Sequence, residues 1–287
     1  MQAVVYENYG PPEMLRLVDV AKPTPGDDEL LVKVHATTVT TGDCNLRNFV
    51  FVPNGFGLIS RLMFGFNAPK TKILGLEFAG EVEAVGANVT LFKPGDAVFG
   101  IDSKRLGAYA EYKCIPEGAG VLAKPANLTF EQAAAIPNGA LTALVFLRNL
   151  ARLQAGQTIL IIGASGSVGS AAVQLAKHYG AVVTGVCSGA NVELVRSLGA
   201  DSVIDYTQTD FTTQGKTYDV IFDTVGKSSF TQSRPSLAPK GCYLAGAGGI
   251  GEFGQMAWTS LFGSRKVLAG QGSERKEDLA YIRELAE

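Results

Sequence analysis

The sequence has 287 residues, of which 46% are hydrophobic and 18% are charged, and its formal net charge is −2. This length predicts two domains, and this composition is typical of a globular protein with sizeable cores. Because the chain is nearly neutral, it has no electrostatic basis for binding nucleic acid or an anionic membrane surface.

No run of about 18 apolar residues is present, so we expect no membrane-spanning helix. The first residues, MQAVVYENYG, lack the basic and apolar regions of a secretory signal, and we expect a cytoplasmic protein. The cysteines are too far apart for a structural zinc cluster, and a disulfide framework is not expected without export. They are Cys44, Cys114, Cys187 and Cys242.

Residues 1–125 are expected to be rich in β-strands. Valine-rich runs such as AVVY, LLVKVHATTV and AGEVEAVG are separated by turn sequences such as GPP and FKPGD. Short strands at this spacing favour a barrel-like fold over repeated βαβ units. Residues 48–72 show little periodicity, which predicts a long loop, or a short helix with loops, that faces the substrate. Its aromatic residues indicate an apolar pocket: Phe49, Phe51, Phe56, Phe64 and Phe66.

The pattern changes near Thr129, where a helix is expected to begin with a capping box formed by Thr129 and Gln132. Strand and helix patterns then alternate, and Gly180 and Gly199 close the two helices among them. This alternation predicts a doubly wound parallel sheet. The runs are TILIIG, SVGSAAVQLAKHYG, AVVTGVC, ANVELVRSLG, DSVIDY, YDVIFDTVG and CYLAGAGG.

The most informative stretch joins the predicted strand 158–162 to the helix that follows it. Gly163 allows a tight turn, Gly166 lets the backbone approach a pyrophosphate, and Gly169 lets the helix pack against the strand. The helix N-terminus adds free N–H groups and a partial positive charge. The sequence therefore predicts a dinucleotide site. Its residues are Gly163, Ala164, Ser165, Gly166, Ser167, Val168 and Gly169.

The end of the second predicted strand bears on which dinucleotide fits. A NAD site usually carries an acid there to bond the ribose 2′-OH. Here the strand AVVTGVC ends at Cys187 and Ser188 without an acid, which favours NADPH over NADH. The nearby cations are few, namely Lys177 and Arg196, so the expected preference is modest.

The sequence resembles the medium-chain dehydrogenase/reductase superfamily, in its zinc-independent quinone oxidoreductase-like branch, which includes enoyl reductase domains and NAD(P)-dependent alcohol dehydrogenase-like proteins. This resemblance implies an α/β protein with a GroES-like catalytic domain at 1–125, to which 271–287 return, and a Rossmann domain at 126–270. It also implies that the chain is truncated at its C-terminus. The motifs that carry it include ILGLEFAGEVEAVGANVTLFKPGDAVFG, AAAIPNGALTAL, LIIGASGSVGSAAVQLAK and YDVIFDTVG.

The zinc alcohol dehydrogenases of this superfamily have Gly-His-Glu where this sequence has Gly75-Leu76-Glu77. The histidine is a catalytic zinc ligand there, and a single thiolate, Cys44, does not make a three-ligand site. We therefore expect no zinc. Glu77 is expected to have a structural role, bonded to backbone or to an arginine such as Arg47.

The resemblance also implies a set of site residues. Asp43 and Arg47 match the zinc-free branch within TTGDCNLR, and Thr40 stands where an asparagine close to the nicotinamide is common. We take these three as residues of the catalytic pocket. The cofactor residues expected outside the glycine loop are Asn138, Thr142, Cys187, Ser188, Tyr206, Val225, Gly246, Ala247 and Gly248.

A competing motif, Tyr109-x-x-x-Lys113, has the spacing of the acid–base pair of short-chain dehydrogenases. In those enzymes it lies on a helix after the glycine loop. Here it precedes the loop in a β-like run, so we expect it to have no catalytic role.

Without zinc, the expected reaction is hydride transfer from NADPH to an electron-poor acceptor. We expect a cytoplasmic NADPH-dependent oxidoreductase that reduces a quinone or an α,β-unsaturated carbonyl compound. No nucleic-acid or membrane partner is expected, and a homodimer is left open. Two alternatives also stay open: a zinc-free NAD(P)-dependent alcohol dehydrogenase and a non-enzymatic NADPH-binding redox sensor.

Overall fold

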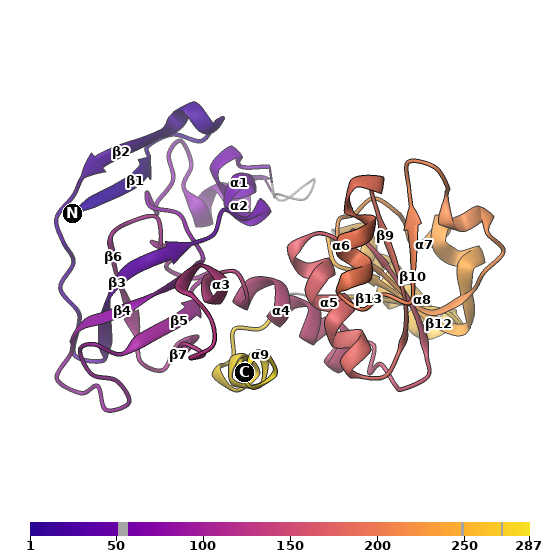
Figure 1. The fold of residues 1–287 in the computed structure, drawn as a ribbon. Coiled ribbons are helices and arrows are strands. Elements are labelled where there is room, and N and C mark those ends of the chain that lie inside the picture. The colour runs from indigo at the N-terminus through magenta and orange to yellow at the C-terminus, as the bar shows by residue number, and fades with distance from the viewer. Residues whose placement is uncertain (51–56, 248–249, 271) are drawn as a thin grey trace. The chain divides into compact units, whose positions relative to one another are not determined.

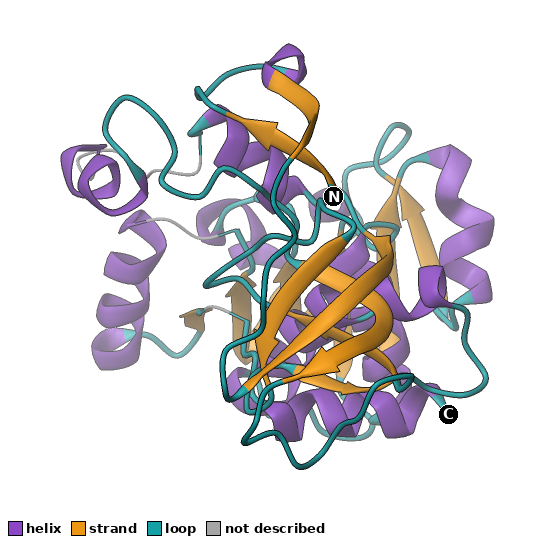
Figure 2. Cartoon of the chain, turned by 90° about the vertical axis from the view of Figure 1, so that its left-hand side faces the viewer, coloured by secondary structure: helices purple, strands orange, loops and turns teal. Residues whose placement is uncertain are grey.

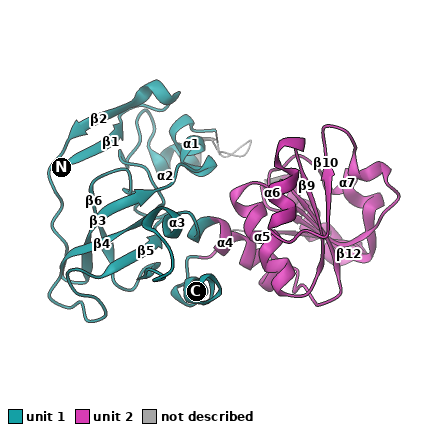
Figure 3. Ribbon diagram, viewed as in Figure 1, with its two compact units in different colours: residues 1–138, 274–287 teal, residues 139–273 magenta. Residues whose placement is uncertain are grey.

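The computed structural model describes residues 1–50, 57–247, 250–270 and 272–287 (Figure 1). Phe51, Phe56 and Gly248, named above, lie outside these ranges. The chain forms two compact units, Met1–Asn138 with Glu274–Glu287, and Gly139–Ser273 (Figure 3). The domain bounds expected from the sequence stay a prediction, because a compact unit is not by itself an independently folding domain.

The first unit contains a five-stranded antiparallel sheet with the order β6-β3-β4-β5-β7. Figure 2 shows its strands in orange, with the helices in purple. A separate antiparallel ribbon is formed by β1 (Gln2–Tyr6) and β2 (Leu15–Asp19). The strands of the five-stranded sheet are β3 (Glu29–Thr37), β4 (Glu77–Val85), β5 (Ala97–Ile101), β6 (Tyr112–Pro116) and β7 (Val121–Ala123).

The core of the first unit is formed by alternate side chains of these strands. Leu30 and Val32 of β3 are fully buried, as are Phe78 and Val82 of β4. Residues two apart on a strand point to the same face, so this spacing places the four side chains on one side of the sheet. Each such side chain contributes roughly 1.5–3 kcal/mol on burial.

The first unit also contains helices before, between and after the strands of its sheet. The capping box predicted at Thr129 is present, since Thr129 accepts the N–H of Gln132 and the Gln132 side chain accepts that of Thr129. The helical segments are η1 (Pro12–Met14), α1 (Thr41–Asn48), α2 (Gly57–Phe64), α3 (Phe130–Ala134) and α9 (Lys276–Ala286). Helix α4 (Pro137–Leu144) crosses the boundary between the units and continues as a π-helical turn, η2 (Val145–Leu150).

The second unit contains a six-stranded parallel sheet with the order β10-β9-β8-β11-β12-β13. This confirms the predicted doubly wound sheet. The strands are β8 (Thr158–Ile162), β9 (Val182–Cys187), β10 (Ser202–Asp205), β11 (Tyr218–Asp223), β12 (Leu237–Ala245) and β13 (Lys266–Ala269). The helical segments are α5 (Ser167–His178), η3 (Gly189–Asn191), α6 (Val192–Ser197), η4 (Phe211–Thr213), α7 (Phe230–Ser233), η5 (Arg234–Ser236) and α8 (Ile250–Phe262).

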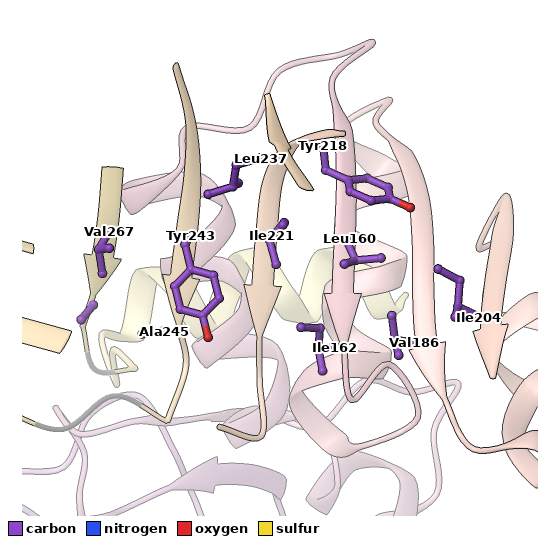
Figure 4. Close-up of a cluster of buried hydrophobic side chains, with 11 residues drawn as sticks. Leu160, Ile162, Val186, Ile204, Tyr218, Ile221, Leu237, Tyr243, Ala245 and Val267 are labelled. Carbon is purple, nitrogen blue, oxygen red and sulfur yellow. The ribbon is translucent and has the colours of Figure 1, made fainter. Parts of the chain in front are cut away.

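Both faces of the central strands are buried. On β8, Leu160 and Ile162 belong to a cluster that includes Ile221 of β11 and Tyr243 of β12 (Figure 4). The intervening residue Ile161 is fully buried as well. A strand covered on both sides is apolar at successive positions, and this explains the continuous run TILII.

Helix α8 and strand β13 are among the elements of the second unit that were not expected from the sequence. Helix α8 contains Gly251 and Gly254, which weaken a helical pattern, and β13 has only four residues. The predicted helix ends are correct, because Gly180 and Gly199 have φ of 76° and 103° after α5 and α6. In the described parts of the chain, none of the helices combines the length and apolar character that crossing a bilayer requires.

Candidate functional site

The turn between β8 and α5 is shaped by Gly163 and Gly169. Gly163 has φ of 81°, and a β-carbon there would lie 2.7 Å from Thr224 Oγ1 and from Val225 Cγ1. A β-carbon on Gly169 would lie 2.0 Å from the carbonyl oxygen of Gly163. The turn and the close approach of α5 to it therefore both require glycine.

Gly166 differs from these two glycines because the space beside it is open. It is the N-cap of α5, and among the described residues beyond its chain neighbours, the atom that a β-carbon there would meet within 4 Å is the Gly163 carbonyl oxygen, 3.4 Å away. By helix geometry, the N–H groups of Ser167, Val168 and Gly169 in the first turn have no intrahelical acceptor. An open space in front of free N–H groups fits a pyrophosphate.

The neighbouring residues of the loop have different positions. Ala164 is fully buried, and its N–H donates to the Val186 carbonyl oxygen at 3.0 Å. Ser165 is half-buried, whereas Ser167 is exposed. The groups of this loop that a ligand could reach are therefore those of Gly166 and the first turn of α5, whereas Ala164 is packed beneath them.

Other predicted cofactor residues also follow the carboxyl ends of strands in this sheet. Val225 comes after β11, and Gly246 and Ala247 come after β12. The N–H of Gly246 donates to the carbonyl oxygen of Asp223 at 2.8 Å. The chain order reverses between β8 and β11, and ligands of open parallel sheets bind at such a point.

Asp223 organises the loop after β11, and we had not assigned it a role from the sequence. It is 1% exposed, and its Oδ1 accepts the N–H groups of Val225 and Gly226 at 3.0 and 2.8 Å. Its Oδ2 accepts the N–H of Ser228 and the hydroxyl of Tyr243. The sequence signal that could have indicated this role is an acid at the end of a buried strand. Through these bonds Asp223 fixes the backbone at Val225, beside Gly163.

The two residues predicted at the end of β9 differ in exposure. The Cys187 side chain is 2% exposed, and burial together with the nearby Asp205 raises the pKa of the thiol. The role expected for Cys187 in cofactor binding stays a prediction. Ser188 is half-buried, and its Oγ accepts Asn191 Nδ2 at 3.1 Å. Of the two predicted residues, Ser188 is the one whose side chain a ligand can reach.

The surroundings of Ser188 hold less positive charge than the sequence suggested. Lys177 pairs with Asp201 at 2.8 Å, and Arg196 pairs with Glu193 at 2.6 Å. Tyr206 is 62% exposed, and its N–H donates to the Cys187 carbonyl oxygen, which brings it to the end of β9. Neither cation is a free partner for a phosphate, because each already neutralises an acid.

Asn138 and Thr142 lie one turn apart on α4. The backbone N–H of Asn138 donates to Glu77 Oε1 at 2.7 Å. Thr142 is half-buried, and a β-carbon on Gly272 would lie 2.9 Å from its hydroxyl oxygen. The helical spacing places both residues on one side of α4.

In the first unit, Thr40 and Asp43 form the N-terminal cap of α1. The Thr40 hydroxyl accepts the N–H of Asp43 and donates to Asp43 Oδ2 at 2.6 Å. Asp43 is 2% exposed, and its Oδ1 accepts the N–H of Gly75 at 3.0 Å. The Thr40 hydroxyl is thus engaged in capping, and Asp43 ties α1 to the segment before β4.

Arg47 has a different partner from the one expected. Its Nε donates to the carbonyl oxygen of Gly10 at 3.1 Å. Glu77 instead accepts the Thr38 hydroxyl and the Asn138 N–H. Of the two alternatives expected for Glu77, a bond to backbone or to an arginine, the backbone bond is the one present. Both side chains are nearly buried, which explains why each has a bonded partner.

Tyr109 and Lys113 are held by separate partners. The Tyr109 hydroxyl donates to the Thr38 carbonyl oxygen at 3.1 Å. Lys113 is 4% exposed and lies 3.4 Å from Asp102, and burial lowers its pKa despite this acid. The expectation that this motif has no catalytic role stays a prediction.

A cavity of about 480 Å³ lies in the first unit beside α1. Its walls are mostly apolar and come from the β1–β2 ribbon, β3 and α1, with Asp43, Cys44 and Arg47 among the lining residues. In residues 1–50, 57–247, 250–270 and 272–287, no group of three or more His, Cys, Asp or Glu side chains could hold a metal ion.

Residues 26–126 match the family model described as an alcohol dehydrogenase GroES-like domain, and residues 167–281 match the one described as a zinc-binding dehydrogenase. The structure is similar to that of the quinone oxidoreductase from Coxiella burnetii, with a TM-score of 0.85 and 31% sequence identity. That similarity covers 100% of this chain and 87% of the other.

Two curated relatives show the range of the similarity. The chloroplastic quinone-oxidoreductase homolog of Spinacia oleracea is 34% identical over 279 residues, which cover 93% of this chain and 81% of the relative. The chloroplastic NADPH-dependent alkenal/one oxidoreductase of Arabidopsis thaliana is 36% identical over 236 residues. That match covers 79% of this chain but 58% of the relative, so the chain spans less than two thirds of that protein's length.

Proposed function

The chain belongs to the medium-chain dehydrogenase/reductase superfamily, in its quinone-oxidoreductase-like branch, and from this premise we propose that it is an NADPH-dependent reductase of quinones and α,β-unsaturated carbonyl compounds. The relatives named above are quinone oxidoreductases and an alkenal/one oxidoreductase, which supports these two acceptor classes. The cytoplasmic location and the homodimer stay predictions, and the relatives include chloroplastic proteins.

The observation that carries the proposal is the open space beside Gly166, in front of the first turn of α5. Gly163 and Gly169 are closed in by neighbouring atoms, whereas Gly166 is not. This difference matches the three separate roles that glycines have in a dinucleotide-binding turn. The free N–H groups of α5 would bond the pyrophosphate, and Val225, Gly246 and Ala247 would lie along the cofactor at the same edge.

The choice of NADPH is supported by the end of β9, where Ser188 stands without an acid beside it in the chain. A carboxylate at that position would accept a bond from a ribose 2′-OH and would repel a 2′-phosphate. Because Lys177 and Arg196 are both ion-paired, the preference is expected to be modest.

Zinc independence is part of the proposal. It is supported by Leu76, which stands where zinc enzymes of the superfamily have a histidine, and by the scattered cysteines. Without a metal to polarise an alcohol, hydride transfer to an acceptor that is already electron-poor is favoured.

A bound NADPH supplies a hydride, and the reduced quinone or enolate then takes up one proton. The protein's contribution is to bind and orient the two partners. The glycine turn would hold the phosphates, and Thr40 and Asn138 are proposed as residues near the nicotinamide. The apolar walls beside α1 suit an uncharged acceptor better than a charged one.

The proposal is tested by steady-state NADPH oxidation with 1,2-naphthoquinone, an enone and an aldehyde, before and after treatment with a chelator. Chelator-insensitive turnover with the quinone or the enone is expected. Reaction with the aldehyde alone, and of its alcohol with NADP⁺, would instead identify an alcohol dehydrogenase. Cofactor binding with no turnover of any acceptor would indicate a non-enzymatic binding protein. Stoichiometric zinc in the purified protein would contradict zinc independence.

A further inference from the structure

Glu77 joins two segments of the first unit, and each leads to a residue that we place near the nicotinamide. Its Oε1 accepts the Asn138 N–H at 2.7 Å, and its Oε2 accepts the hydroxyl of Thr38. Thr38 lies two residues before Thr40, and Asn138 is the second residue of α4. Glu77 is 2% exposed, and both bonds are partly buried, where hydrogen bonds are stronger than in water.

The bond to Asn138 meets a specific need of α4. Pro137, the first residue of the helix, has no N–H, so the Asn138 N–H is the first donor of the helix and has no intrahelical acceptor. A carboxylate at this end also interacts favourably with the helix dipole. Glu77 therefore fixes the position of the first turn of α4.

Stability alone does not explain an acid at this place. Burial raises the pKa of Glu77, while the bonds from Thr38 and Asn138 act in the opposite direction, and the Asp43 carboxylate nearby raises the pKa further. Both bonded donors are neutral groups. A well-packed apolar side chain of similar size would avoid the cost of burying this charge.

We propose that Glu77 is a positioning residue for hydride transfer. By accepting one bond from each segment, it holds Thr40 and Asn138 at a fixed separation, so that the nicotinamide ring meets both. This inference rests on the proposed function, because it assigns Glu77 a role in the geometry of that same reaction. Glu77 itself touches neither cofactor nor acceptor in this proposal.

The first test compares Glu77→Met with Glu77→Gln. Methionine fills the space but accepts neither bond, whereas glutamine keeps an acceptor for Asn138 and can donate to the Thr38 oxygen. We expect Glu77→Met to lower kcat for the quinone by about 10- to 100-fold, the range expected for misplaced reactants. Glu77→Gln should keep kcat within about threefold of the wild-type value. Glu81→Gln, an exposed position on the same strand, is the matched control and should leave kcat unchanged.

Two further readouts separate positioning from a loss of folded protein. The dissociation constant of NADPH should change by less than about threefold, since the pyrophosphate cradle is untouched. The primary deuterium isotope effect on kcat, measured with NADPH deuterated at C4, should rise in Glu77→Met because hydride transfer limits more of the turnover. A partly unfolded preparation would lose kcat with an unchanged isotope effect, and that result would contradict the proposal.

A second pair of variants keeps the test decisive if Glu77→Met does not fold. Thr38→Val removes the hydroxyl that bonds the Glu77 carboxylate. Thr213→Val is the control, since it removes a hydroxyl that bonds a backbone carbonyl oxygen, that of Asp210 at 2.8 Å, away from the cavity beside α1. We expect kcat to fall by about threefold or more in Thr38→Val, with a raised isotope effect, and to stay at the wild-type value in Thr213→Val.

The outcomes distinguish the two proposals. If the wild type binds no nicotinamide cofactor, or reduces none of the acceptors, the proposed function fails and the role of Glu77 fails with it. If the wild type turns over and Thr38→Val or Glu77→Met keeps the wild-type kcat and isotope effect, the positioning role alone is wrong.

Discussion

The carbonyl oxygen of Gly163 and the α-carbon of Gly169 lie so close together that a β-carbon on Gly169 would stand 2.0 Å from that oxygen. No rotamer change relieves this contact, because both groups belong to the backbone. The start of α5 is therefore packed directly onto the turn that precedes it.

Gly169→Ala should lower the free energy of unfolding by about 2–4 kcal/mol, because α5 must move away from the turn. Urea unfolding measures this directly. Gly166→Ala is the matched control in the same loop, since its β-carbon has open space, and it should cost less than about 1 kcal/mol. Equal losses in the two variants would show that the packing of α5 does not depend on Gly169.

Gly166→Val should remove cofactor binding from a folded protein. The isopropyl group would occupy the open space in front of α5, where the pyrophosphate is proposed to lie, and the loss should exceed about 100-fold in affinity. Fluorescence titration with NADPH gives the affinity, and circular dichroism reports the fold. Gly118→Val, at another open glycine, serves as the control. An unaltered NADPH affinity in Gly166→Val would move the phosphate site elsewhere.

Asp223→Ala should destabilise the protein by about 3 kcal/mol or more, because it leaves several buried donors around the loop after β11 without an acceptor. Thermal or urea unfolding provides the measurement. Asp210→Ala is the control, since Asp210 also accepts a backbone N–H, from Thr212, but is exposed. A loss no larger than that of Asp210→Ala would mean that the loop has other support.

Glu77→Gln should gain stability relative to the wild type as the pH rises. The pKa of Glu77 is raised in the folded protein, so above its ordinary value of 4.5 the native state holds the proton more tightly than the unfolded chain does. The stability of the wild type therefore falls as the pH rises from about 4.5 through the raised pKa. Glutamine does not titrate, so the unfolding free energy of Glu77→Gln lacks this dependence on pH.

The measurement is the difference in unfolding free energy between Glu77→Gln and the wild type at several pH values from 4 to 8. This difference should favour the variant increasingly towards pH 8. A difference that stays constant over this range would show that the carboxyl group has the same pKa in both states. Such a gain in Glu77→Gln, together with the lower kcat expected of Glu77→Met, would fit a carboxylate that is kept for the geometry of the site at a cost in stability.

Ser188→Asp should weaken NADPH binding and strengthen NADH binding, each by about tenfold, because a carboxylate repels a 2′-phosphate and accepts from a 2′-OH. Titration of both cofactors against wild type and variant gives the ratio. Cys187→Asp is the less informative substitution, because the side chain at 187 is buried and a carboxylate there would destabilise β9. An unchanged ratio in Ser188→Asp would place the 2′ group away from the end of β9.

The parts of the fold that were predictable from sequence are those set by short-range patterns. Two examples are the glycine turn between β8 and α5 and the capping box at Thr129. In each, a few neighbouring residues determine the local conformation. The alternating strand and helix patterns were sufficient to predict the parallel sheet. Helix α8 escaped prediction because Gly251 and Gly254 interrupt its pattern, although packing against β13 supports it.

The candidate site was predictable to a smaller extent, because it depends on contacts between distant parts of the chain. The partner of Arg47 is the Gly10 carbonyl oxygen, 37 residues away, and no local pattern indicates it. The burial of Cys187 follows from the sheet around it, and the ion pairs of Lys177 and Arg196 depend on side-chain geometry. The sequence shows that residue 223 is an acid, but it does not show which N–H and hydroxyl groups donate to it.

Helix α9 belongs to the first unit although it follows the second in the chain. Lys276 donates to the Glu117 carbonyl oxygen at 3.1 Å, and Asn127 donates to that of Ala286 at 2.8 Å. During synthesis on the ribosome, the sheet of the first unit must therefore wait for α9 until the whole parallel-sheet unit has been translated. The second unit, which is continuous in sequence, can complete its fold within that interval, before α9 docks.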